Sequence, residues 1–123
     1  MSEETQQKLQ QVLGDYKASQ KQYQKTLAQM QKLEGQFQEN SAVKKELDLL
    51  KDENEVYKLI GPVLVKQELV EAKQNVEKRM NYIQGELKRL EDSITSLDTK
   101  QDSLRDELNK LQVKLQQEAQ KMQ

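Results

Sequence analysis

Most side chains that could carry chemistry in this sequence are carboxylates and amines. The chain contains 21 Asp and Glu residues and 20 Lys and Arg residues, but no histidine and no cysteine. The commonest general base and metal ligand is therefore missing, as is any thiol nucleophile. Many acidic residues stand three or four positions from a Lys or Arg, the spacing of ion pairs on a helix. Because no glycine-rich phosphate loop accompanies them, we predict no enzymatic activity, catalytic residue, metal site or cofactor.

The charge balance narrows the class of partner. A net charge of −1 without a basic run disfavours nucleic-acid binding, which depends on neutralising phosphates. No apolar stretch approaches the ~20 residues that a bilayer-spanning helix requires. Residues 1–4 are polar and acidic, unlike a signal peptide, and the lack of cysteine suits a reducing compartment. We therefore expect a cytoplasmic protein that binds neither nucleic acid nor membrane.

The composition points to elongated helices. With 34% hydrophobic residues, 33% charged residues and five aromatic residues, the chain is too polar for a large compact core. The second half has a heptad repeat in which twelve of fourteen positions are apolar, which is typical of a coiled coil. These positions are Val76, Met80, Ile83, Leu87, Leu90, Ile94, Leu97, Gln101, Leu104, Leu108, Leu111, Leu115, Glu118 and Met122.

The first half has a weaker repeat. Its members, seven residues apart, are Leu9, Tyr16, Tyr23, Met30 and Phe37. We assign them to position d of a heptad, which places Leu13 and Leu27 at position a and leaves Val12 off the seam. The pattern then slips near Asn40 and resumes from Val43, which predicts a local change in the supercoil.

The two halves fit each other as antiparallel partners folded about Pro62. In this register Tyr16 lies opposite Leu108, and Tyr23 lies opposite Gln101, where a hydrogen bond could fix the register. A shift of seven residues would preserve the same a–d phase, so the heptads alone leave the register open.

The segment between the halves predicts a β-hairpin. It is dense in β-branched and apolar residues over 56–60 and 63–67, with Gly61 and Pro62 between these two runs. Thirteen residues are too many for a simple turn between helices. An isolated two-stranded hairpin is marginal in water, so we expect it to pair with other chains in a larger sheet or barrel.

The predicted fold is therefore mainly α. It is a long antiparallel two-helix coiled coil with one β-hairpin at the bend that joins an intersubunit β-barrel. We expect a single domain over 1–123, with helices over 1–52 and 68–123 and the hairpin over 55–67. The residues predicted to make subunit contacts are Val56, Tyr57, Leu59, Ile60, Gly61, Pro62, Val63, Leu64 and Val65.

Several motifs resemble the β-type prefoldin subunits. The stretch VYKLIGPVLVKQEL over 56–69 is the most specific, and it is followed by VEKRMNYI over 76–83 and ELKR over 86–89. The segment before the hairpin, around Asn40, Val43, Lys44 and Leu47, is also similar. The outer parts of the helices resemble the family only as coiled coil.

The resemblance implies a hetero-hexamer of two α-type and four β-type prefoldin subunits whose hairpins form a double β-barrel. It implies that the coiled-coil tips hold unfolded clients, such as actin and tubulin chains, and pass them to the cytosolic group II chaperonin without using ATP. At the tips we expect apolar side chains to contact clients, with Val12 and Val113 off the seam. The predicted client-binding residues are Leu9, Val12, Leu13, Leu111, Val113, Leu115 and Met122.

Two other functions remain open at this point. A generic coiled-coil tether would dimerise in parallel through the second helix and would give the hairpin no role. A related prefoldin-like complex with a transcription or assembly role would use the same elements with different partners. The client range, the order of neighbours in the hexamer and the residues that contact the chaperonin do not follow from the sequence.

Overall fold

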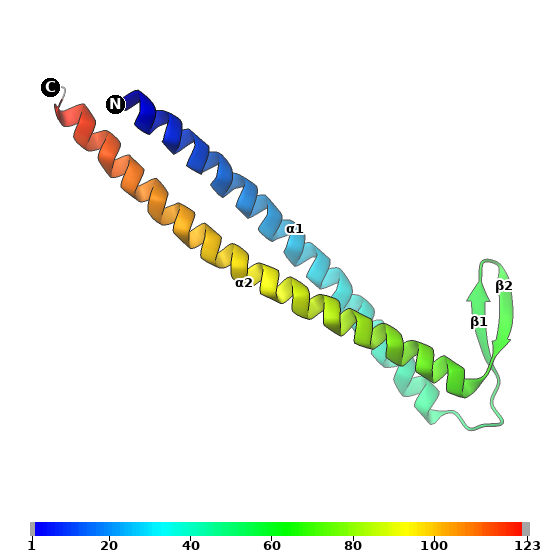
Figure 1. The fold of residues 1–123 in the computed structure, drawn as a ribbon. Coiled ribbons are helices and arrows are strands. Elements are labelled where there is room, and N and C mark those ends of the chain that lie inside the picture. Colours follow the sequence, from blue (N-terminus) through cyan, green and yellow to red (C-terminus); the bar gives the residue numbers. More distant parts are fainter. Residues whose placement is uncertain (1, 122–123) are drawn as a thin grey trace. The chain divides into compact units, whose positions relative to one another are not determined.

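The computed structural model describes residues 2–121 as two helices joined by a β-hairpin (Figure 1). Helix α1 spans Ser2–Leu49, strand β1 spans Val56–Ile60, strand β2 spans Val63–Gln67 and helix α2 spans Leu69–Lys121. The two strands are antiparallel. The predicted combination of two long helices and one hairpin is therefore confirmed. No helix among the described residues is long and apolar enough to cross a membrane.

The chain forms two compact units. The first contains residues 1–29 and 90–123, and the second contains residues 30–89. In the first unit, the Thr5 hydroxyl donates a hydrogen bond of 3.0 Å to Glu118, and Arg105 donates one of 3.2 Å to the Tyr16 hydroxyl. The helix segments of this unit are therefore antiparallel, with the start of α1 beside the end of α2.

These contacts test the predicted register. The predicted fold places Thr5 opposite residue 119, and its observed partner Glu118 is one residue away. A shift of seven residues would move this partner by two helical turns. The predicted hydrogen bond between Tyr23 and Gln101 is absent from the described residues.

The apolar stripe of α2 lies where the heptad pattern predicts. From Val76 to Glu118, every predicted seam position is buried or half-buried. Val76, Ile83 and Leu90 are the most deeply buried among them. Met122, the last predicted position, lies outside the described residues.

The buried face of α1 differs from the prediction. Its second row of seam residues is Thr5, Val12, Ser19, Thr26, Leu33, Asn40 and Leu47. This row lies one residue before the predicted one: Val12 is only 3% exposed, whereas Leu13 is 40% exposed. The predicted positions of Leu13, Leu27 and Val12 are therefore wrong.

Side-chain size explains the correction. In the first unit, α2 presents mainly leucine to the seam, and the close packing of protein interiors then favours small side chains such as Thr5, Ser19 and Thr26 at the facing positions. The hydroxyl of Thr26 donates to the carbonyl of Gln22 at 2.8 Å, which satisfies it inside the helix. Such polar residues gave no apolar signal in the sequence.

The heptad of α1 also continues without the predicted slip. Phe37, Asn40, Lys44 and Leu47 keep the alternating three- and four-residue spacing and are all buried or half-buried. Val43, from which the pattern was predicted to resume, is exposed. The predicted break near Asn40 is therefore wrong.

The second unit has its own small core next to the hairpin. Leu47 from α1 packs with Leu69, Ala72 and Val76 from α2, and Leu50, Val56 and Met80 pack against this cluster. Two ion pairs between the helices border it: Lys44 lies 3.4 Å from Glu77, and Lys73 lies 3.8 Å from Asp48. These pairs show that the helix segments of this unit are antiparallel as well.

A turn separates α1 from the hairpin. The backbone N–H of Lys51 donates to the side-chain carbonyl of Asn54 at 2.7 Å, and the N–H of Asn54 donates to the carbonyl of Lys51 at 2.9 Å. Asparagine favours such turns because its side chain mimics a backbone hydrogen bond. The turn redirects the chain from Leu50 toward β1.

The corrected seam predicts different effects for two adjacent residues. Val12→Glu places an unpaired carboxylate in the seam and should lower the free energy of unfolding by at least about 3 kcal/mol. Leu13→Glu should cost less than about 1 kcal/mol because the side chain can reach solvent. Urea unfolding followed by circular dichroism measures both, and equal losses would contradict the corrected seam.

Candidate functional sites: the hairpin and the helix ends

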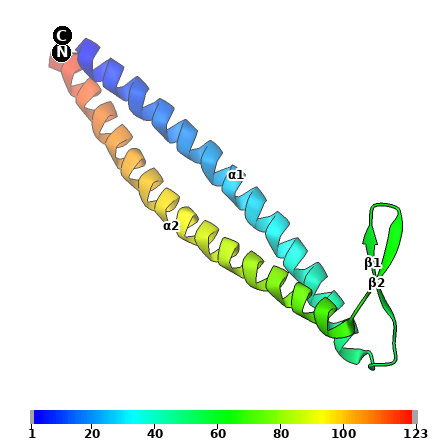
Figure 2. The ribbon, with the colours of Figure 1, turned by 45° about the vertical axis from the view of Figure 1, so that its right-hand side comes forward.

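The hairpin closes through a tight turn. Ile60 pairs with Val63, which leaves Gly61 and Pro62 as a two-residue turn. Gly61 has φ of +58°, a conformation that glycine adopts without the steric cost of a side chain. Glycine at the first central position is the pattern of a type II′ turn, whose twist matches that of the strands. The hairpin extends away from the neighbouring ends of α1 and α2 (Figure 2).

Both faces of the hairpin are apolar. Cross-strand partners share a face, so Ile60, Val63 and Val65 lie on one face, and Tyr57, Leu59 and Leu64 lie on the other. Each of these six side chains is between 45% and 67% exposed. A hairpin that faced water on one side would carry polar residues there. This hairpin instead has three large apolar side chains on each face, with one lysine beside each set: Lys58 on the first face and Lys66 on the second.

The strand edges are also unpaired. The described sheet contains only β1 and β2, so the outer edge of each strand has no neighbouring strand within the described residues. Exposed edges of this kind readily accept further strands. The hairpin therefore offers both apolar faces and backbone hydrogen-bonding groups to another chain.

Glu55 holds the base of the hairpin through both strands. Its carboxylate accepts a hydrogen bond of 2.6 Å from the Tyr57 hydroxyl and lies 4.0 Å from the Lys66 ammonium. Tyr57 and Lys66 are cross-strand partners. The hydrogen bond to Glu55 and then its charge raise the pKa of Tyr57. Exposed contacts of this type orient side chains more than they stabilise the fold.

The nine residues predicted to make subunit contacts all lie in this hairpin. Eight of them are exposed, whereas Val56 is half-buried and packs against the core cluster. Val56 therefore anchors β1 to the helices. Sequence reasoning missed Leu49 and Val70, which flank the hairpin on the ends of the two helices and are 83% and 65% exposed. The sequence signal that could have identified them is that both are large apolar residues outside the heptad seam.

The helix ends in the first unit contain most of the predicted client-binding residues. Leu9, Leu111 and Leu115 are half-buried in the seam, and Val12 is buried. Leu13 and Val113 are exposed, the latter by 52%. Met122 lies outside the described residues. Of the predicted set, Leu13 and Val113 therefore offer the most accessible surface.

Acidic residues form no metal site in the part of the chain that the structure describes. No group of three or more Asp and Glu side chains there could hold a metal ion. The absence of a bound metal or cofactor in solution stays a prediction.

The antiparallel helices and the hairpin that joins them define a helical-hairpin class of protein. Residues 4–122 match a family model described as prefoldin subunit, and the chain belongs to this family. Within this family, the motifs over 56–69 resemble the sixth subunit type in particular. Comparison with known proteins confirms this similarity.

Three relatives illustrate it. The chain is 46% identical over 116 residues to prefoldin subunit 6 of Mus musculus, and the match covers 94% of this chain and 91% of the mouse protein. The values for prefoldin subunit 6 of Homo sapiens are the same, with 90% of the human protein covered. The identity to prefoldin subunit 6 of Arabidopsis thaliana is 55% over 74 residues, which is 60% of this chain and 57% of the plant protein.

A solved structure supports the fold. The prefoldin beta subunit from Thermococcus strain KS-1 has a TM-score of 0.54 to this chain at 24% sequence identity. The match covers 89% of this chain and 90% of the archaeal chain. At this identity the likeness concerns the fold alone.

The turn predicts a specific substitution effect. Gly61→Ala should destabilise the hairpin by about 1–2 kcal/mol because alanine disfavours a positive φ. A steric clash would not contribute, since no neighbouring atom lies within 4 Å of the new methyl group. Gly61→Asn should cost less, since asparagine tolerates this conformation. Hydrogen exchange of the β1 and β2 amides measures the effect. Equal protection in the alanine and wild-type proteins would contradict it.

Proposed function

We propose that this chain is one subunit of a cytoplasmic, hetero-hexameric co-chaperone. Other α-type and β-type prefoldin subunits complete the particle, and their hairpins together form a β-barrel platform. The complex captures unfolded or nascent polypeptides, such as actin and tubulin chains, and delivers them to the group II chaperonin. It works by binding alone, without ATP and without enzymatic chemistry.

The hairpin with two apolar faces carries the proposal. Full burial of one Val, Leu or Ile side chain contributes about 1.5–3 kcal/mol, and roughly half of this remains available at each exposed position. Five such side chains, together with Tyr57, therefore offer several kcal/mol to an assembly that covers them. The unpaired strand edges supply backbone hydrogen bonds for the same assembly.

The tether alternative is less well supported. A parallel dimer through α2 needs a free apolar stripe on that helix. In both units, the stripe of α2 is instead buried or half-buried, and residues of α1 face it. Such a dimer would have to displace α1, and it would leave the exposed hairpin without a role. A prefoldin-like assembly complex would use the hairpin in the same way, and its partners would distinguish it.

Client binding is proposed at the helix ends of the first unit. Leu13 and Val113 lie outside the seam and are exposed, so they can contact a client without opening the helix pair. The half-buried Leu9, Leu111 and Leu115 would add apolar surface when the last turns fray. Shallow apolar contact of this kind suits unfolded chains of varied sequence because it imposes no shaped pocket.

The first test concerns assembly. Leu59→Asp with Leu64→Asp places two charges on one face of the hairpin and should abolish entry into the complex, while the helices stay folded. Lys58→Asp changes the charge of the same strand at a polar position and serves as the matched control. Size-exclusion chromatography with α-type and β-type partner subunits measures assembly. A double variant that assembles like the wild type would contradict the role of the hairpin.

The second test concerns clients. Leu13→Asp with Val113→Asp should weaken suppression of aggregation of a denatured client severalfold, because apolar contact surface is lost without disturbing the seam. Gln20→Asp with Gln120→Asp adds the same charges at equivalent heptad positions and is the control. Hexamer formation should be unchanged in both. If the two double variants protect the client equally well, Leu13 and Val113 do not contact it.

A further inference from the structure

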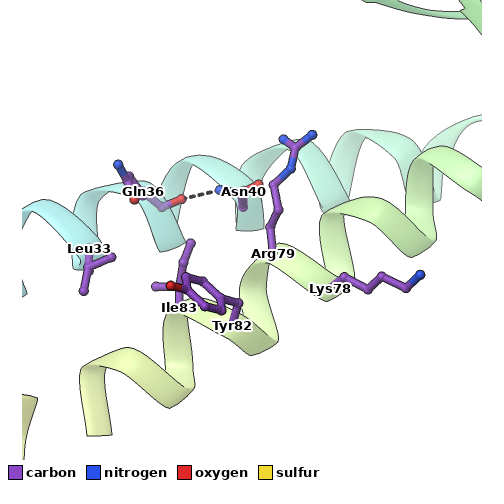
Figure 3. Close-up of a pocket in the computed structure, with 7 residues that line it drawn as sticks. All are labelled: Leu33, Gln36, Asn40, Lys78, Arg79, Tyr82 and Ile83. Atoms are coloured by element: carbon purple, nitrogen blue, oxygen red, sulfur yellow. Dashed lines mark hydrogen bonds between the residues drawn. The ribbon is translucent and has the colours of Figure 1, made fainter. Parts of the chain in front are cut away.

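A groove lies between the two helix segments of the second unit and includes no residue of the hairpin. Its volume is about 420 Å³, within the usual range for ligand sites. Residues of both helices line it: Leu33, Gln36 and Asn40 from α1, and Lys78, Arg79, Tyr82 and Ile83 from α2 (Figure 3).

The floor of the groove is apolar. Ile83 is buried in the seam and Leu33 is half-buried, and their apolar side chains form the floor of the groove. Tyr82 is 68% exposed, and its ring lies beside Ile83 (Figure 3). A large aromatic side chain left this open on a helix surface favours contact with an apolar group of a partner.

The charged side chains that line the groove are all positive. Lys78 and Arg79 line it, and no acidic residue does. Neither cation forms an ion pair within residues 2–121, whereas Lys44 and Lys73 on the same two helices pair with Glu77 and Asp48. Two unpaired cations beside an apolar floor complement a ligand that carries both negative charge and an apolar group.

Polar groups of α1 complete the lining. The side-chain N–H of Asn40 donates to the backbone carbonyl of Gln36 at 2.7 Å, which orients the Asn40 amide. Its carbonyl oxygen and the side-chain amide of Gln36 remain available to a ligand. Side-chain amides can both accept hydrogen bonds from the N–H groups of a bound peptide and donate hydrogen bonds to its carbonyl groups.

We propose that this groove binds an acidic peptide segment of a partner protein. One large apolar side chain of the segment occupies the floor between Leu33, Tyr82 and Ile83. Flanking Asp or Glu residues contact Lys78 and Arg79, and the peptide backbone contacts Gln36 and Asn40. The site shares no residue with the proposed assembly hairpin or the proposed client surface, so it would recruit a folded or regulatory partner through side chains of its own.

The test uses the full chain and its assembled complex with fluorescent peptides. The probe is Glu-Glu-Phe-Glu-Glu, and the comparison peptides replace Phe with Ser or every Glu with Gln. The probe should bind more tightly than either comparison peptide, and its binding should weaken as salt rises. Lys78→Glu with Arg79→Glu should weaken it at least about tenfold, because both attractions become repulsions. Lys88→Glu, an exposed charge reversal on the same helix outside the groove, should change it less than about twofold.

A second readout concerns the apolar floor. Tyr82→Ala should reduce the preference for the Phe peptide over the Ser peptide while leaving the salt dependence unchanged. Circular dichroism should show unchanged helicity in all variants. Equal binding of the three peptides, or equal effects of the Lys78/Arg79 and Lys88 reversals, would overturn the proposal. Binding to the free chain that disappears in the assembled complex would also overturn it, since a neighbouring subunit would then cover the groove.

Discussion

Packing between the two helices is the constraint on which the other features depend. With so few apolar residues, the chain cannot build a compact core and buries its apolar surface in a narrow seam. In the first unit, α2 supplies large leucines and α1 supplies small residues such as Thr5, Ser19 and Thr26 at its most buried positions. This difference in size makes each helix the natural partner of the other. It also explains why the stripe of α2 is not free to form a separate dimer.

The same seam determines what is left exposed. In the second unit it ends in the cluster around Leu47, Leu69 and Val76, and Val56 ties the first strand to this cluster. The rest of the hairpin has no core of its own, so its apolar side chains remain in solvent. An isolated two-stranded hairpin is at best marginally stable in water, and burial against another chain would stabilise it. The exposed apolar hairpin agrees with membership of a family of subunits.

The polar contacts have a more local role. Lys44 with Glu77 and Lys73 with Asp48 border the core of the second unit but are largely exposed, so each contributes little free energy. Their value lies in register, as does that of Arg105, which donates to Tyr16 and lies 5.9 Å from its ring centre. Lys78 and Arg79 form no ion pair within residues 2–121, and both line the apolar groove of the second unit. Charges without internal partners are available for recognition.

The sequence by itself determined the periodic and compositional features. The leucine stripe of α2 was readable because its apolar residues repeat with a regular spacing, and the hairpin was readable from its β-branched residues and the Gly61-Pro62 turn. Both signals are local, so neither requires knowledge of the partner surface. The motifs around the hairpin carried the family resemblance for the same reason.

Only the tertiary structure decided which row of α1 is buried. The sequence favoured Leu13 and Leu27 because they are large and apolar, but the facing leucines of α2 leave room for Val12, Ser19 and Thr26 instead. Likewise, the groove between Asn40 and Tyr82 requires residues from two helices that lie far apart in the chain. Burial depends on the volume of the opposing side chains, and a linear pattern does not contain that volume.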